Sequence, residues 1–257
     1  MNREREIKQV VLISGGVGRL GSAFVRALIS QGDKVCVLEN MSKAAALAKL
    51  GLAQSEYLEI VEGDATEPKD VDRALTCCVS KFGTVTAAVH CAYPKTRNWG
   101  VGFEELDAGE LSENLFRQLG GVIVFSQRVI RAFREQSGGS LVHVSSILGV
   151  APPKFSHYEG LGMTSPIEYS AVKAGTISVS RYLAKYCRQE GIRVNCISPG
   201  GIRDNHDPEF QKRYQEDCNS KGLLDGDDLV SALMFLLSPE SIFVNGQNII
   251  VDDGWSL

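Results

Sequence analysis

The sequence predicts an α/β fold in which one doubly wound parallel sheet carries helices on both of its faces. Short apolar runs of strand length alternate along the chain with segments of helical periodicity. A glycine-rich turn connects the first of these strands to the first helix. The 257 residues contain no internal repeat, linker or low-complexity tract, so we expect a single domain that spans residues 1–257.

The first strand and the first helix enclose a glycine motif. Residues 9–13 form an apolar run rich in Val and Ile, which predicts a buried strand. The turn that follows reads Ser14-Gly15-Gly16-Val17-Gly18-Arg19-Leu20-Gly21. Apolar residues then recur at helical spacing as far as Gly32, which ends the helix. Glycines let the backbone approach a pyrophosphate, and a helix N-terminus offers free N–H groups, so this unit predicts a Rossmann-type dinucleotide site.

The second strand, residues 34–38, indicates which dinucleotide binds. It ends in Glu39, and a carboxylate at this place binds the adenosine ribose hydroxyls and would repel a 2′-phosphate. The sequence therefore favours NAD as the cofactor. NADP stays open as an alternative, because Arg19 in the glycine turn and Lys43 could bind that phosphate.

The remaining elements continue the alternation. We expect further strands at residues 57–61, 84–91, 140–145, 192–197 and 247–251, and further helices at residues 66–82, 104–136, 169–190 and 227–237. Strands that alternate with helices in this way form a parallel sheet with helices on both faces.

Tyr169 and Lys173 form a candidate catalytic pair. The preceding Ser165-Pro166-Ile167-Glu168 predicts a helix start in which Ser165 is the cap, Pro166 takes the first helical position and Glu168 completes a capping box. Tyr169 then falls in the first turn, and Lys173 lies one turn later on the same face. A free phenol has a pKa of about 10. A neighbouring ammonium lowers that pKa, which suits the phenol to general acid–base catalysis.

Composition argues against several classes of protein. With 44% hydrophobic and 23% charged residues and a net charge of −4, the chain gives no support for nucleic-acid binding. Its apolar runs are far shorter than the roughly 20 residues that cross a bilayer. The charged segment 1–6 lacks a signal-peptide core. Seven cysteines without framework spacing indicate free thiols and a cytoplasmic protein, and four scattered histidines give no reason to expect a metal site.

Taken in order, these pieces resemble the short-chain dehydrogenase/reductase family over nearly the whole chain. The likeness rests on the glycine turn, Gly63-Asp64, the serines that end strand 140–145, Tyr169-x-x-x-Lys173, the segment Arg193 to Gly200, and the C-terminal segments Asn245-Gly246-Gln247 and Val251 to Gly254. Each motif is weak alone, but their joint order is specific.

The resemblance implies a role for each matching residue. Tyr169 is the acid–base group, Lys173 binds the nicotinamide ribose and lowers the pKa of the tyrosine, and Ser146 hydrogen-bonds the reacting oxygen. Ser145 competes for the serine role, and Ser146 matches the usual position better. The remaining cofactor contacts come from the glycine turn, from the strand ends and from the segment after strand 192–197: Gly15, Gly18, Arg19, Leu20, Gly21, Glu39, Asp64, Ala65, Cys91, Ala92, Pro199, Gly200 and Ile202.

The chain departs from the family pattern at several of these places. Arg19 stands where short members carry their middle glycine, so the turn fits the G-x-x-G-x-x-G spacing of the family's longer members instead. Asp204 replaces a threonine near the nicotinamide amide. The usual Asn-Asn-Ala-Gly segment is His90-Cys91-Ala92-Tyr93. Gln118 takes the place of the relay asparagine, with Asn114 one turn earlier as the alternative. A short insertion precedes Tyr169.

Three loops, about residues 93–103, 150–165 and 203–225, are expected to surround the substrate. They carry polar and basic side chains: Lys95, Arg97, Lys154, His157, Glu159, Arg203 and His206. Such a lining favours a hydroxylated, anionic substrate such as a sugar phosphate or a nucleotide sugar. Cys91 to Pro94, Tyr158-Glu159-Gly160, Ser198 to Ile202 and the ending Val251 to Leu257 also resemble bacterial flagellin-modification-type dehydrogenases of nonulosonic (legionaminic) acid pathways.

These observations favour a nicotinamide-dependent oxidoreductase that interconverts an alcohol and a ketone on a sugar-derived substrate. Two alternatives remain: a sugar epimerase or dehydratase with tightly held NAD, and a non-catalytic relative that acts as a binding subunit. The family resemblance also implies a homodimer or homotetramer, assembled through the helices at 104–136 and 169–190.

Overall fold

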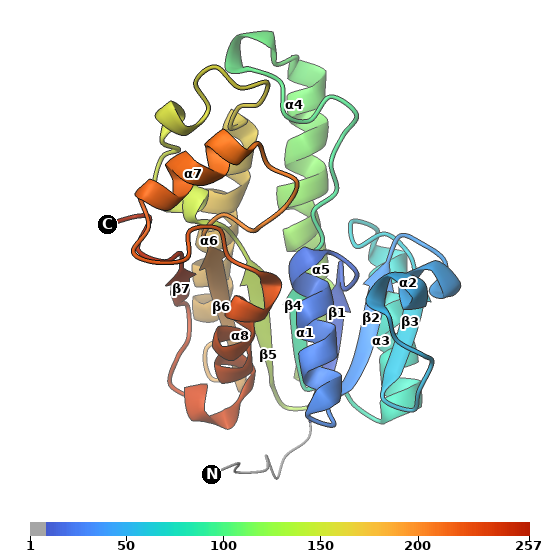
Figure 1. Ribbon diagram of the computed structural model, residues 1–257. Helices are drawn as coiled ribbons and strands as arrows, with labels where there is room; N and C mark the ends of the chain where they lie inside the picture. The colour runs from blue at the N-terminus through green and yellow to red at the C-terminus, as the bar shows by residue number, and fades with distance from the viewer. Residues whose placement is uncertain (1–8) are drawn as a thin grey trace.

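The computed structural model describes residues 9–257, so the charged segment 1–6 considered above lies outside the described residues. Within residues 9–257, seven parallel strands form one sheet in the order β3-β2-β1-β4-β5-β6-β7 (Figure 1). The strands are β1 (Val10–Ser14), β2 (Lys34–Glu39), β3 (Leu58–Glu62), β4 (Ala87–His90), β5 (Gly139–Val144), β6 (Ile192–Pro199) and β7 (Asn248–Val251). The α-helices are α1 (Arg19–Ser30), α2 (Lys43–Leu50), α3 (Pro68–Phe82), α4 (Ala108–Leu115), α5 (Gly121–Glu135), α6 (Ile167–Tyr186), α7 (Pro208–Glu216) and α8 (Val230–Leu237).

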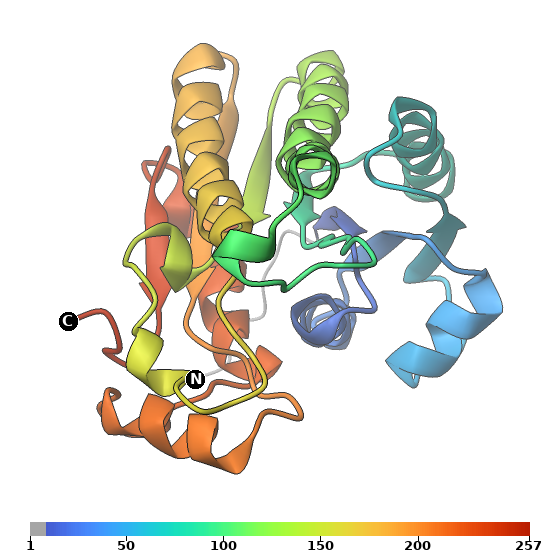
Figure 2. The same cartoon turned by 90° about the horizontal axis from the view of Figure 1, so that it is seen from above.

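The helices cover both faces of the sheet, as the sequence predicts. Figure 2 shows α3, α5 and α6 on one face and α1 and α2 on the other. An apolar core lies under each layer: Phe125 and Phe133 of α5 are fully buried on the first face, and Phe24 and Leu28 of α1 are buried on the second. Burying one such side chain stabilises a fold by about 1.5–3 kcal/mol. None of the helices within residues 9–257 is long and apolar enough to cross a membrane.

The strand order reverses between β1 and β4, and this reversal positions the site. The chain moves outward from β1 to β3 on one side and from β4 to β7 on the other. In such a sheet, ligands bind at the carboxyl ends of the strands beside the reversal. In Figure 1, α7 and the α4 end of the α4–α5 helix rise above these strand ends.

Two helices lie where the sequence analysis expected none. Helix α7 falls inside the expected loop 203–225: the Asp207 side chain accepts from the N–H of Glu209, Pro208 takes the first helical position, and Phe210 and Tyr214 bury one face. Helix α2 begins behind a capping serine and ends at a glycine in the left-handed conformation. Both helices are short, so their periodicity is a weak signal.

The predicted capping box of the Tyr169 helix is wrong. Helix α6 begins at Ile167, and the extended Pro166 (φ −67°, ψ 138°) is its cap residue without any side-chain cap hydrogen bond. Glu168 is 1% exposed and both of its carboxylate oxygens lack a hydrogen-bond partner among the described residues. The Glu168 side chain is therefore buried and does not reach back to the cap. The helix also ends earlier than expected, at Tyr186.

The long helix expected at 104–136 is interrupted. A π-helical turn, Phe116–Gly120, joins α4 to α5. An inserted π-helical turn within a helix is frequent at functional sites. Gln118 lies inside this turn and is 2% exposed.

Candidate active site

A cavity of about 1020 Å³ opens at the carboxyl ends of the strands, beside the reversal of strand order. Its walls include the glycine turn, the ends of β2, β4, β5 and β6, and the first turns of α6. Of the residues that the sequence favours for catalysis or cofactor binding, all but Gln118 line this cavity, and the alternatives Lys43 and Asn114 do not. The lining residues are Gly15, Gly18, Arg19, Leu20, Gly21, Glu39, Asp64, Ala65, Cys91, Ala92, Ser146, Tyr169, Lys173, Pro199, Gly200 and Ile202.

The glycine turn, called the glycine cradle below, packs so closely on the surrounding backbone that Gly15 and Gly21 leave no room for a side chain. Gly15 has φ +71°, and a Cβ atom there would lie 2.6 Å from the backbone nitrogen of Ala92. A Cβ atom on Gly21 would overlap the carbonyl oxygen of Gly15. Gly18 precedes α1 as its cap residue, and neither a side-chain cap nor an acidic residue occupies the first turn. The free N–H groups of α1 therefore face the cavity in the way that a dinucleotide pyrophosphate requires.

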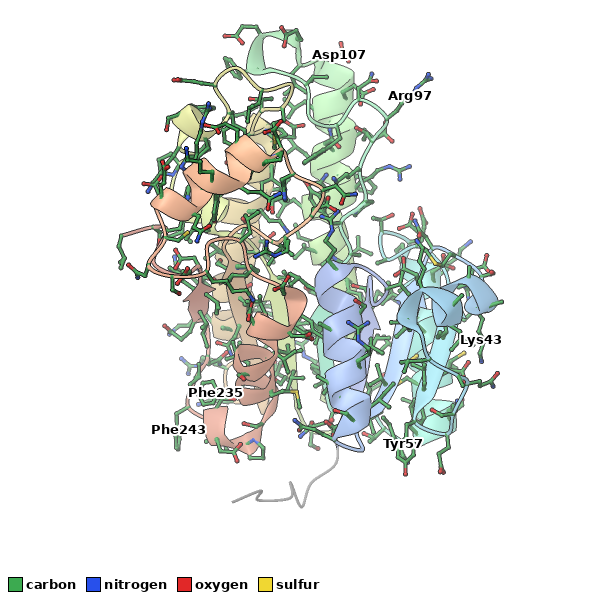
Figure 3. All side chains as sticks on the ribbon, viewed as in Figure 1. Lys43, Tyr57, Arg97, Asp107, Phe235 and Phe243 are labelled. Carbon is green, nitrogen blue, oxygen red and sulfur yellow. The ribbon has the colours of Figure 1, made fainter. Side chains whose placement is uncertain are left out.

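Glu39 ties the end of β2 to the glycine turn. Its carboxylate accepts hydrogen bonds from the N–H groups of Val17 and Asn40, each at 3.2 Å. Lys43, the other candidate partner for a 2′-phosphate, donates to Glu59 at 2.7 Å and does not line the cavity. Figure 3 shows Lys43 at the outer edge of the molecule. The carboxylate is thus present at the adenosine end, and Lys43 is not.

The two serines after β5 point in different directions. The Ser145 hydroxyl donates to the backbone carbonyl of Lys173 at 2.7 Å, so its proton is used in a contact with α6. The Ser146 hydroxyl accepts from the N–H of Leu148 at 3.2 Å and keeps its proton free for another partner. Because Ser146 stands in the cavity near Tyr169, the geometry favours it over Ser145 for the serine role.

The expected lowering of the Tyr169 pKa by Lys173 is not what the structure shows. Burial raises the pKa of the Tyr169 phenol, and a hydrogen bond to Ser146 opposes that rise in part. Lys173 is itself desolvated, which lowers its pKa to about 8. Its ammonium donates to the Val144 carbonyl at 3.0 Å and lies 5.5 Å from the centre of the Tyr169 ring. The ammonium therefore lies over the Tyr169 ring.

Gln118 lies behind the cavity wall. Its amide nitrogen donates to the carbonyl of Pro94 at 3.1 Å, and its amide oxygen has no hydrogen-bond partner among the described residues. Asn114, the alternative, is completely buried, and neither of its amide atoms has a partner among residues 9–257. Neither side chain lines the cavity. The relay role therefore stays a prediction for either residue.

An aromatic wall beside Tyr169 was missed by the sequence analysis. The Tyr93 and Tyr169 rings meet edge to face at 5.4 Å, and Trp99 lies 5.8 Å from Tyr93. The ammonium of Lys95 sits 4.1 Å from the centre of the Trp99 ring. Tyr93 stands where the family pattern has glycine. That departure is the feature of the sequence that could have predicted an aromatic side chain beside Tyr169.

The expected polar lining of the substrate end is largely wrong. His157 and Lys154 both bind Asp217, at 2.5 Å and 3.3 Å, and Arg203 pairs with Asp225 at 3.4 Å. Arg97 points outward in Figure 3. Of the polar residues named above, Lys95 and His206 line the cavity. The other side chains at this end are mostly apolar or aromatic: Ile147, Leu148, Tyr158, Met163, Phe210, Tyr214, Leu223 and Trp255.

Residues 150–165 and helix α7 together form a pocket cover. Phe210, Tyr214 and Trp255 pack in one apolar cluster, and the Tyr214 and Trp255 rings stack at 5.6 Å. Arg213 of α7 donates to the carbonyls of Ser156 and Glu159, at 3.1 Å and 2.7 Å. The polar side chains of the loops thus hold the pocket cover together, and its apolar side chains face inward.

Two departures from the family pattern meet at the mouth of the cavity. Arg19 forms an ion pair with Asp204, and both residues line the cavity. The Asp204 carboxyl has a lowered pKa, chiefly because it accepts from the backbone of Asn205 and secondarily because of Arg19. Within residues 9–257, no three His, Cys, Asp or Glu side chains gather to hold a metal ion.

Comparisons with known proteins agree with this geometry. Residues 16–256 match the family model described as enoyl-(acyl carrier protein) reductase. The chain is 35% identical to the post-translational flagellin modification protein A of Campylobacter coli, over 97% of this chain and 98% of that protein. It is 26% identical to the 7alpha-hydroxysteroid dehydrogenase of Bacteroides fragilis, over 97% of this chain and 95% of that protein.

A solved structure gives the same picture. The short chain dehydrogenase of Leptospira borgpetersenii, determined with bound NAD+, superposes with a TM-score of 0.87 at 29% identity, over 100% of this chain and 96% of that one. The fold, the order of the motifs and the matches to relatives indicate the same family over almost the full length of this chain. The chain therefore belongs to the short-chain dehydrogenase/reductase family of oxidoreductases.

Proposed function

We propose that this protein is an NAD-dependent oxidoreductase that interconverts an alcohol and a ketone on a carbohydrate-type substrate. One observation carries the proposal: Ser146, Tyr169 and Lys173 line the same cavity as the glycine cradle and Glu39. A catalytic set and a dinucleotide site that share one cavity can bring a substrate and a cofactor together. This convergence weighs against the non-catalytic alternative.

The residues divide the chemistry as follows. The glycine cradle and the start of α1 would hold the pyrophosphate, and Glu39 would bind the adenosine ribose. The nicotinamide, when bound, supplies or accepts the hydride. Tyr169 transfers a proton at its hydroxyl to or from the substrate oxygen, and Ser146 donates a hydrogen bond to that oxygen. Lys173, positioned by the Val144 carbonyl, contributes positive charge beside the phenol while it is protonated.

NAD is the proposed cofactor because Glu39 presents its carboxylate at the adenosine end of the cavity. The NAD+ bound to the relative from Leptospira supports this choice. Arg19, which could serve a 2′-phosphate, is paired with Asp204, and Lys43 is paired with Glu59.

A sugar is the proposed substrate class. Two features support it: the relative of Campylobacter coli is named for flagellin modification, and the wall of Tyr93 and Trp99 gives flat aromatic faces of the kind on which sugar rings pack. Lys95 lines the same region, and its ammonium would suit an anionic group on the substrate. A role in bacterial surface or flagellin glycan synthesis follows from this proposal.

We further propose a homodimer or homotetramer in the cytoplasm. Phe116, Ile123, Tyr182 and Tyr186, on the connected helices α4–α5 and on α6, are 61%, 50%, 67% and 57% exposed, which supports contact with a second copy. All seven cysteines are free thiols, which supports a reducing compartment. Sedimentation analysis would test the assembly, and a monomer at micromolar concentration would refute it.

Cofactor titration followed by a substrate screen tests the function. NADH and NADPH are titrated in parallel, with energy transfer from Trp99 and Trp255, which both line the cavity. We expect clear NADH binding and weaker NADPH binding. A screen of sugar phosphates and nucleotide sugars then follows NAD reduction at 340 nm. Tighter binding of NADPH would refute the role of Glu39, and cofactor binding with turnover of steroids alone would refute the sugar assignment.

A further inference from the structure

Arg19 and Asp204 join two parts of the fold that stand apart in the sheet. Arg19 is the first residue of α1, which follows β1, whereas Asp204 lies in the loop that follows β6. Strands β4 and β5 lie between β1 and β6 in the sheet. The ion pair therefore bridges the mouth of the cavity, which both residues line.

The backbone on both sides of this bridge is anchored. The loop of Asp204 is held to Leu224, because the N–H of Arg203 donates to the Leu224 carbonyl at 2.8 Å. On the other side, Gly226 packs so closely on α1 that a Cβ atom would lie 2.8 Å from the Arg19 carbonyl oxygen. The backbone that carries the two side chains is thus held in place on both sides of the cleft.

Stability of the fold does not account for the pair. The Arg19 and Asp204 side chains are 57% and 38% exposed, and exposed ion pairs contribute little to folding. Yet both residues replace small or neutral ones of the family pattern, a glycine and a threonine, on opposite sides of one cleft. Two such departures that contact each other indicate a joint role at the mouth of the cavity.

We propose that Arg19 and Asp204 form a side-chain clasp that closes across the cofactor cleft and slows the release of the bound dinucleotide. This inference rests on the proposed NAD-dependent function. The dinucleotide leaves only after the ion pair opens, so the pair acts mainly on the dissociation rate. Lys95 and His206 also line the cavity, and each interacts electrostatically with Arg19 and Asp204.

A double-mutant cycle tests the clasp. Protein loaded with NADH is mixed with excess NAD+ in a stopped-flow instrument, and the loss of energy transfer from tryptophan reports NADH dissociation. Arg19→Met and Asp204→Asn should each accelerate dissociation by about two- to five-fold, the range that one exposed ion pair supports. The combined variant should show no further acceleration, and the charge reversal Arg19→Asp with Asp204→Arg should restore slow release.

The competing explanation is that Arg19 binds the pyrophosphate directly and Asp204 merely holds it in the free protein. Asp204→Asn would then leave dissociation unchanged or slow it, and the charge reversal would fail to restore it. Either result overturns the clasp, as does strict additivity of the two single variants. High salt should bring the wild-type rate toward those of the variants, because the pair is exposed to solvent.

A control and the wild type separate this inference from the proposed function. Glu190→Gln removes a comparable exposed ion pair, with Arg134, far from the cavity lining, and should leave the dissociation rate unchanged. Wild-type protein that binds no NADH would refute the proposed function and the clasp together. Wild-type protein that binds NADH, with variants that release it at the same rate, would refute the clasp alone.

Discussion

The Lys173 ammonium lies 5.5 Å from the centre of the Tyr169 ring and is held there by the Val144 carbonyl, which accepts its hydrogen bond at 3.0 Å. The same ammonium lies 5.0 Å from the centre of the Tyr93 ring. A strand end therefore fixes the lysine between two aromatic side chains. The backbone of β5 thus helps to fix the position of this lysine.

Removal of the Tyr169 hydroxyl should separate chemistry from binding. We expect Tyr169→Phe to lower kcat by about 10²–10⁴, the usual contribution of a general acid–base group. The Kd for NADH should stay within two-fold, because the ring remains in place. Tyr57→Phe, at an exposed tyrosine that does not line the cavity, is the control and should behave as the wild type. Turnover retained in Tyr169→Phe would remove Tyr169 from the mechanism.

The desolvation of Lys173 should be visible in stability. The pKa of Lys173 is lowered to about 8 in the folded protein, against about 10.4 in an unfolded chain. Between these values the unfolded state binds one more proton, so stability rises with pH by about 1.4 kcal/mol per unit. We expect urea unfolding of the wild type to show this rise relative to Lys173→Met.

The control for this experiment is Lys185→Met, at the exposed end of the same helix, which should keep the wild-type profile between pH 8 and about 10. Parallel stability curves for the wild type and Lys173→Met would mean that Lys173 keeps its charge when folded. Lys173→Met should also lose turnover. Turnover is measured where the variant is folded, so this loss reports the function of the lysine and not its effect on stability.

Two buried histidines should weaken the fold in acid. The pKa of His90 lies well below 6.5 and that of His143 is lowered to about 3, in both cases chiefly because of burial. The unfolded chain therefore binds protons first as the pH falls, and stability present above about 6.5 is lost toward pH 3. Each histidine accounts for about 1.4 kcal/mol per pH unit at most.

His90→Asn is the variant that tests this. The Ser14 hydroxyl, which lies 2.7 Å from Nδ1 of His90, can hydrogen-bond an asparagine in the same place. We expect a shallower loss of unfolding free energy between pH 6.5 and pH 4.5 than in the wild type, measured by urea unfolding. Equal slopes for the two proteins would show that His90 takes up its proton without penalty in the folded state.

Asp217 should matter for the substrate and not for the cofactor. Asp217 caps the C-terminus of α7 and binds His157 and Lys154 of residues 150–165, so it links the two parts of the pocket cover. We expect Asp217→Asn to raise KM for the substrate by about two- to five-fold, as the loss of partly exposed ion pairs implies. The Kd for NADH should not change. Limited proteolysis should cut residues 150–165 faster in the variant.

Glu216→Gln provides the matched control, since it removes the same charge from the neighbouring exposed position of α7. It should leave KM and the rate of proteolysis at the wild-type values. An equal effect of both substitutions would mean that the net charge of α7, and not the tie through Asp217, governs the pocket cover.

Local patterns predicted most of the fold. The seven strands lie within three residues of their expected bounds, because apolar runs and glycine turns are properties of short segments. The rule that parallel strands present their carboxyl ends on one edge then brought Gly15, Glu39 and Ser146 to a common cavity. The capping box at Ser165 failed for the opposite reason: burial of Glu168 depends on neighbours that a four-residue pattern does not contain.

The sequence by itself thus determined the parallel sheet, the glycine cradle and the place of Tyr169 and Lys173 on one helix, since spacing along the chain encodes all three. Only the tertiary structure decided that Arg19 meets Asp204, that His157 and Lys154 turn toward Asp217, and that Lys173 is desolvated. These features arise from contacts and burial between distant segments. Their energies depend on the local dielectric and on partner geometry, which residue spacing does not contain.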